Sequence, residues 1–166
     1  MKQLLIIRHA KSDWNALIPT DFDRPLNERG HRDAPKMAKR VVDRKVKLDA
    51  IITSTAMRAF TTANYFASVY SNETKQVIPI IEKPELYLAE PPVFFDVISK
   101  ANDSYDNIAV FSHNPGITDF INQSGVAQLD EMPTCGIFAI SIDTKKWSDF
   151  KKAKKQFLFF DYPKNG

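Results

Sequence analysis

Cysteine is almost absent from this sequence, which has 166 residues and a single cysteine, Cys135. One cysteine excludes an internal disulfide and favours a reducing compartment, so we expect a cytoplasmic location. Long apolar runs are lacking as well. The apolar run that leads to Arg8 has only four residues, which is too few for a signal peptide, and no segment is long enough to cross a bilayer. We therefore expect no membrane partner.

Charge of one sign is not in large excess. The 23 Lys and Arg residues and 20 Asp and Glu residues give a net charge of +3, which is too mild to indicate nucleic-acid binding. Internal repeats and low-complexity tracts are also missing. The length is that of one domain, and 43% hydrophobic and 26% charged residues are ordinary for a globular protein. We expect a single domain over residues 1–166.

Apolar strand-like runs alternate with helical patterns along the chain. Strands are predicted at residues 3–8, 48–53, 77–81, 107–112, 136–142 and 156–162. Helices are predicted after an Asn27 cap, after a Ser54 or Thr55 cap, from Pro91 and Pro92, and after the turn at residues 113–116. The strand at 77–81 contains Pro79 and belongs near an edge, and the last two strands are expected to pair. This alternation predicts an α/β fold, a three-layer αβα arrangement with a mostly parallel central sheet.

Arginine and histidine follow three of the predicted strands. Arg8 and His9 end the first strand, Arg58 lies in the first turn of the helix after the second, and His113 follows the strand at 107–112. The carboxyl ends of parallel strands share one edge, where open α/β folds bind ligands. The chain has only three histidines, so two at such positions are difficult to attribute to packing. We expect these four side chains to line one pocket.

Such a pocket suits a phosphate group. Guanidinium groups bind phosphate oxygens through paired hydrogen bonds, helix N-termini add backbone donors, and an imidazole can attack phosphorus or donate to its oxygens. The alternative is a zinc site made by the two histidines with Asp13 or Asp23. It is disfavoured because Arg8 and Arg58 would repel a divalent cation. We expect no metal and no cofactor.

The three strand ends resemble the motifs of a known family. Residues 8–15 (RHAKSDWN) resemble the Arg-His-Gly signature of the histidine phosphatase superfamily, the phosphoglycerate-mutase-like enzymes. Residues 54–59 (STAMRA) resemble its second motif and residues 112–114 (SHN) its third. The run at 23–30 (DRPLNERG) is most similar to the small phosphohistidine phosphatases of the SixA type. The resemblance covers nearly the whole chain and implies a phosphoglycerate-mutase-like fold.

The resemblance also implies a role for each matching residue. His9 would be the nucleophile that carries the phosphoryl group, and Arg8 and Arg58 would bind its oxygens. The implied catalytic residues are thus His9, Arg8, Arg58 and His113, the last as a donor to the phosphoryl group, and the implied substrate-binding residues are Ser12 and Asn15.

Two positions depart from the family pattern. Ala10 stands where the wider superfamily has a glycine after the Arg-His pair. Mutase-like members carry a glutamate after the third strand as general acid, and no acid falls clearly in that slot, residues 85–90. Glu90 and Asp23 are the possible substitutes, and we expect neither to act. Asp21 and Asp23 are expected to brace the long irregular stretch at residues 10–26.

The sequence therefore predicts a metal-independent phosphatase with a phosphohistidine intermediate. We expect its substrate to be phosphohistidine on a protein, because a short chain leaves little length for lids over the site. A small-molecule phosphomonoesterase or mutase of the same superfamily, acting on a small phosphorylated compound, is one alternative. A non-catalytic phosphate-binding adaptor is the other. The lysines at positions 145, 146, 151, 152, 154 and 155 form either a solvated edge or a docking patch for an acidic phosphoprotein.

Overall fold

The computed structural model describes residues 1–15 and 17–166. A six-stranded sheet in the order β3-β2-β4-β1-β5-β6 forms its centre. The strands are β1 (Lys2–Arg8), β2 (Ala50–Thr53), β3 (Ile80–Glu82), β4 (Asn107–Ser112), β5 (Ile137–Ile142) and β6 (Lys155–Asp161). The helices are α1 (Glu28–Asp43), α2 (Met57–Thr74), α3 (Pro91–Ser99) and α4 (Gly116–Gln123), with short 3₁₀ turns η1 (Pro84–Leu86) and η2 (Trp147–Asp149).

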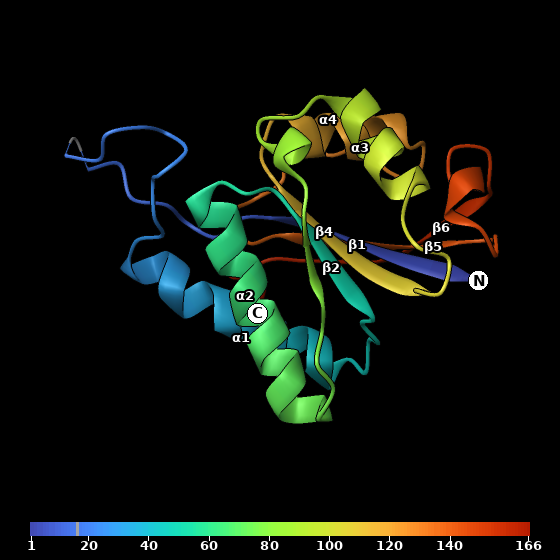
Figure 1. Cartoon of the computed structure of the whole chain (residues 1–166), viewed down its shortest axis with the longest axis horizontal. Helices are drawn as coiled ribbons and strands as arrows, with labels where there is room; N and C mark the ends of the chain where they lie inside the picture. Colours follow the sequence, from blue (N-terminus) through green and yellow to red (C-terminus); the bar gives the residue numbers. More distant parts are fainter. Residues whose placement is uncertain (16) are drawn as a thin grey trace.

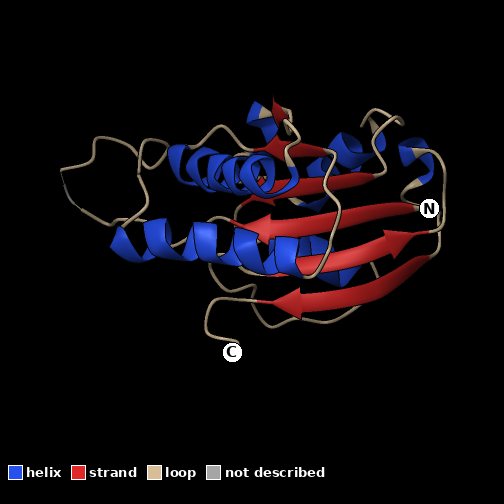
Figure 2. Ribbon diagram, turned by 90° about the horizontal axis from the view of Figure 1, so that it is seen from below, coloured by secondary structure: helices blue, strands red, loops and turns tan. Residues whose placement is uncertain are grey.

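The sheet is mostly parallel and is covered on both faces. β3, β2, β4 and β1 pair in parallel, β5 runs antiparallel to β1, and β6 runs antiparallel to β5. Figure 1 shows α1 and α2 on one face of the sheet and α3 and α4 on the other, and Figure 2, seen from the side of α1 and α2, shows the strands behind these helices. The predicted three-layer α/β fold and the pairing of the last two strands are confirmed.

Strand β1 shows why the sheet lies in the middle layer. Leu4 and Ile6 pack into the apolar cluster that contains residues of α3 and α4, whereas Leu5 and Ile7 pack into the cluster that contains residues of α1 and α2. Successive side chains of a strand point to opposite faces. A strand buried on both faces is therefore apolar at its central positions, which explains the uninterrupted run of residues 4–7 that precedes Arg8.

Some element boundaries differ from the predictions. Asn27 caps α1 as predicted, since its side chain accepts a hydrogen bond from the Gly30 backbone N–H at 2.9 Å. The prediction that Ser54 or Thr55 caps the next helix is wrong: the cap residue is Ala56, without a side-chain cap bond. The third strand begins at Ile80, because Pro79 has no N–H to donate to the sheet.

Among the described helices, none has the length and apolar character needed to cross a membrane.

Candidate active site

A cavity of about 380 Å³ opens at the carboxyl edge of the parallel strands. It is lined by Arg8, His9, Lys11, Ser12, Trp14, Asp21, Arg24, Arg58, Leu88, His113, Asn114 and Thr134. The four side chains at the strand ends and Ser12 therefore come together. Asn15 does not line this cavity. It borders an adjoining recess, and its side-chain oxygen accepts from the Leu17 N–H at 2.9 Å.

His9 is fixed by the strands on either side of it. Its backbone N–H donates to the carbonyl of Ser112 at 3.2 Å, and its carbonyl accepts from the Cys135 N–H at 3.0 Å. The ring Nδ1 lies 2.7 Å from the carbonyl oxygen of Ala10. A carbonyl oxygen only accepts, so Nδ1 carries the proton and the lone pair of a neutral ring is on Nε2.

The environment of His9 favours the neutral ring. Burial is the largest cause that lowers its pKa well below 6.5, and electrostatic interactions with His113, Arg58 and Arg8 lower it further. Arg8, the neighbour in sequence, contributes less than burial does. The His9 ring is therefore neutral at neutral pH, and its contact with the Ala10 carbonyl leaves the free lone pair on Nε2.

His113 faces His9 across the cavity, with 5.2 Å between the ring centroids. Its Nε2 lies 2.8 Å from the Ser54 hydroxyl, and that hydroxyl oxygen also accepts from the Ala56 N–H at 3.3 Å. With the Ser54 hydroxyl as the donor to Nε2, the His113 proton is on Nδ1. Burial first, and then the charge of Arg58, lowers the His113 pKa to about 3, so His113 is also neutral and presents an N–H donor.

Arg58 enters the cavity from the first turn of α2 and is held by the loop between β1 and α1. Its Nη1 donates to the backbone carbonyl of Asp21 at 2.7 Å, and its Nη2 to the Asp21 carboxylate at 3.0 Å. The same carboxylate accepts from the Tyr87 hydroxyl at 2.5 Å and from Arg24 Nη2 at 3.1 Å. The Asp21 side chain therefore ties three separate segments together at the cavity.

Sequence reasoning did not find Arg24, Tyr87 or Trp14 as parts of this region, and it treated Asp21 only as a residue that braces the loop. Bracing is what the structure shows for Asp21, since its bonds to Arg58 and Tyr87 span 37 and 66 positions in sequence. The spacing of Asp21 and Arg24, three residues apart in a loop, was the one available signal. It indicates a local ion pair but not the partner segments.

Three buried side-chain nitrogens have no hydrogen-bond partner within the described part of the chain: Arg8 Nε, Arg58 Nε and His113 Nδ1. All three belong to residues that line the cavity. Buried polar groups are almost always satisfied in folded proteins, and each exception needs an explanation. Two guanidinium N–H groups and an imidazole nitrogen in residues that line one cavity would suit a ligand with several acceptor oxygens and negative charge.

A general acid is not evident at this cavity. Asp21 is the one carboxylate among its described lining residues. The Tyr87 hydroxyl, assisted by Arg24 and Arg58, lowers the Asp21 pKa to about 2, so Asp21 has no proton to donate at neutral pH. Glu90 is exposed and lies outside the lining, and Asp23 accepts from the Thr20 hydroxyl at 2.7 Å. In the segment where the family carries its glutamate, the cavity is lined by Leu88.

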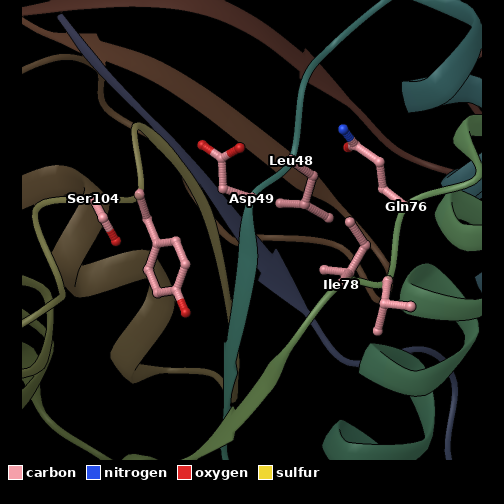
Figure 3. A pocket seen from close by; sticks show the side chains of 7 residues that line it. Leu48, Asp49, Gln76, Ile78 and Ser104 are labelled. Atoms are coloured by element: carbon pink, nitrogen blue, oxygen red, sulfur yellow. The ribbon is translucent and has the colours of Figure 1, made fainter.

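A second hollow, of about 390 Å³, lies at the opposite edge of the sheet, where β2 and β4 begin (Figure 3). Its carboxylate, on Asp49, already accepts from the backbone N–H groups of Asp106 and Asn107. The lysines at 145–155 also lie at that edge, because Ile142 pairs with Lys2 at the start of β1. They are therefore not beside the cavity that holds His9. No group of three metal-ligating side chains occurs among the residues described.

Similarity to known proteins agrees with this geometry. Residues 4–87, half of the chain, match the family model of the histidine phosphatase superfamily (branch 1). The 2,3-bisphosphoglycerate-dependent phosphoglycerate mutase of Staphylococcus epidermidis is 30% identical over 82 residues, which are 48% of this chain and only 35% of the mutase. The chain thus spans about a third of the length of the curated relatives that it matches.

Solved structures share the fold over nearly the full length. The protein histidine phosphatase SixA in complex with tungstate has a TM-score of 0.80 at 20% identity, and the alignment covers 98% of each chain. A SixA protein of Agrobacterium tumefaciens has a TM-score of 0.78 at 24% identity, also over 98% of each chain. With the family match and the Arg-His, Arg58 and His113 constellation at one sheet edge, the chain belongs to the histidine phosphatase superfamily, as its motifs predict.

Proposed function

We propose that this protein is a phosphatase that carries the phosphoryl group on Nε2 of His9, and that its substrate is phosphohistidine on a protein. The observation that carries the proposal is the set of three unpartnered donors, Arg8 Nε, Arg58 Nε and His113 Nδ1, beside an imidazole whose free nitrogen is Nε2. A tetrahedral phosphoryl group offers them oxygens, and its phosphorus can then meet the nucleophile.

The reaction has two steps in which bonds and protons balance. Nε2 of His9 attacks phosphorus and forms a P–N bond while the P–N bond of the substrate breaks. The bonding pair returns to the substrate imidazole, which takes its proton from solvent. Water then attacks the phosphorus, the bond to His9 breaks, and inorganic phosphate leaves. The donors on Arg58 and His113 stabilise the charge on the transferring oxygens in both steps.

We propose phosphohistidine rather than a phosphate ester as the substrate because the cavity has no evident general acid among its described residues. An ester releases an alkoxide, which needs a placed proton donor, whereas phosphohistidine releases an imidazole that can be protonated by water. Asp21 is ionised and held by Tyr87 and two arginines, so the cavity offers no evident donor among its described residues. The tungstate complex of a SixA relative supports binding of a tetrahedral oxyanion in this fold.

A rapid-quench experiment with ³²P-labelled substrate tests the proposal. Label should appear on His9, stable in base and lost in acid, and His9→Ala should abolish both label and turnover without unfolding the chain. His31→Ala, at an exposed histidine on α1, is the matched control and should retain both.

A substrate panel then separates the alternatives. We expect a phosphohistidine protein to be hydrolysed faster than phosphoserine peptides and alkyl phosphates. An alkyl phosphate as the best substrate would replace this proposal with a small-molecule phosphomonoesterase. Binding of tungstate without turnover of any substrate in the panel would instead support the adaptor.

A further inference from the structure

Trp14 lines the mouth of the cavity but is left largely in solvent. Its exposed fraction is 73%, although it belongs to the same lining as the buried His9. Aromatic side chains usually stabilise a fold by being buried, and the exposed indole of Trp14 contributes little to the fold in this way. Leu88, also in the lining, is 54% exposed. The mouth of the cavity therefore carries two exposed apolar side chains, Trp14 and Leu88, beside the charged Asp21, whereas His9, Arg58 and His113 are buried inside.

The position of Trp14 is supported by Arg24. The guanidinium carbon of Arg24 lies 3.7 Å from the centroid of a Trp14 ring, which is a stacked contact. The N–H groups of Arg24, which lie in the guanidinium plane, donate to the Asp21 carboxylate at 3.1 and 3.4 Å and to the Ser12 hydroxyl. Arg24 is itself buried. The edge of the Arg24 guanidinium is thus hydrogen-bonded to loop residues, and its flat face is stacked on the indole of Trp14.

This construction leaves a flat aromatic surface beside the phosphoryl site. A guanidinium that covers one face of an indole leaves the rest of the ring for another planar group. A phosphoryl group bound near His9, Arg58 and His113 directs the remainder of its substrate outward to the mouth. When that remainder begins with a ring, the ring lies toward the mouth of the cavity, which Trp14 lines.

We propose that Trp14, backed by Arg24, is the binding platform for the leaving group and selects substrates whose phosphoryl group is attached to a planar ring. Under the proposed function, that ring is the imidazole of phosphohistidine, and this part of the inference rests on that function. The platform itself does not, because an aryl phosphate presents a ring in the same place. The contribution of an aromatic pair corresponds to about fivefold in affinity.

The test compares ring-bearing and ringless ligands in the whole protein. The substrates are a phosphohistidine peptide and phenyl phosphate, which carry rings, and phosphoramidate and acetyl phosphate, which do not. Calorimetry with phenylphosphonate and methylphosphonate gives the same comparison without turnover. Trp14→Ala should lower kcat/KM and affinity about fivefold for the ring-bearing ligands and by less than about twofold for the ringless ones, whereas Trp14→Phe should retain the preference.

Leu17→Ala is the matched control, because Leu17 is an 88% exposed apolar residue of the same loop that lies outside the cavity lining. It should change none of these values. An equal loss for both ligand classes in Trp14→Ala would show that Trp14 only supports the loop, and no change for either class would show that it does not touch the ring; either result overturns the inference. Failure of the wild type to hydrolyse phosphohistidine, with a Trp14-dependent preference for phenylphosphonate, would overturn the proposed substrate and retain the platform.

Discussion

The carboxylate of Asp21 lies 3.0 Å from Nη2 of Arg58, on the arginine that the proposed mechanism uses to hold the phosphoryl group. The backbone carbonyl of Asp21 holds Nη1 of the same guanidinium at 2.7 Å. Arg58 therefore makes two hydrogen bonds to Asp21, one to the charged carboxylate and one to the uncharged backbone carbonyl. Removal of the charge alone leaves Arg58 anchored by the backbone.

Asp21→Asn separates the two contributions. The carboxylate is a negative charge at the rim of an anion site, so its loss should strengthen binding of tungstate or phosphate by about fivefold through Coulombic attraction. Competition of tungstate with substrate measures the effect, preferably at low salt, because screening reduces it. Asp23→Asn, two residues away and bonded to Thr20, should leave the affinity unchanged. Weaker tungstate binding in Asp21→Asn would mean that anchoring of Arg58 outweighs charge.

Arg58→Ala should be far more damaging than loss of an exposed arginine. Arg58 is 2% exposed, so its charge acts in a site that water does not screen. Removal of a preorganised donor to the transition state costs on the order of a hundredfold in kcat. Arg32→Ala is the control, since Arg32 is 71% exposed and 3.9 Å from Asp33, and a surface ion pair contributes under about 1 kcal/mol. Steady-state kinetics on both variants would contradict the assignment if the two losses were equal.

The sequence pattern predicts the site residues that lie at strand ends, but it does not predict the contacts that hold Arg58 in place. Arg8, His9 and His113 directly follow apolar strands, so the parallel order of β1 and β4 is enough to bring them to one edge. Asp21 and Tyr87 meet only because a loop and a segment 66 positions away pack together, and no periodicity encodes such a contact. The third strand begins at Ile80 and not at residue 77, because Pro79 has no N–H to donate to the sheet although its neighbours are apolar.

The two site histidines should make the fold less stable in mild acid. Burial lowers the pKa of His9 well below 6.5 and that of His113 to about 3, whereas the unfolded chain regains values near 6.5. Below pH 6.5 the unfolded state therefore binds more protons than the native state, so these two groups leave the free energy of unfolding unchanged above pH 6.5 and reduce it as the pH falls below that value. Each group accounts for up to about 1.4 kcal/mol per pH unit.

Urea unfolding at pH 7.5 and 5.5 measures this loss. His113→Asn should reduce the difference between the two free energies of unfolding, whatever its effect on absolute stability. His31→Gln, at the exposed site on α1, should reduce it less. In the native protein, the ring protons of His9 and His113 should keep their NMR shifts between pH 7.5 and 5.5. A midpoint near 6.5 for His9 would contradict its burial as a neutral ring.

The rate should depend steeply on how well the leaving group departs. kcat/KM includes cleavage of the substrate bond, and with no evident acid at the cavity, the departing oxygen of an ester must bear its own negative charge in the transition state. A series of aryl phosphates should therefore show kcat/KM falling as the pKa of the phenol rises, with alkyl phosphates slowest. Phosphohistidine should lie above them all, because its imidazole leaves with a proton from water.

Glu90→Gln and Asp23→Asn should leave kcat/KM unchanged for every member of the series, since both side chains lie outside the cavity lining. A rate that hardly varies with the phenol, and that becomes steep when one of these two carboxylates is removed, would show that a general acid reaches the site, and an ester would then replace phosphohistidine as the substrate that this cavity is built to cleave.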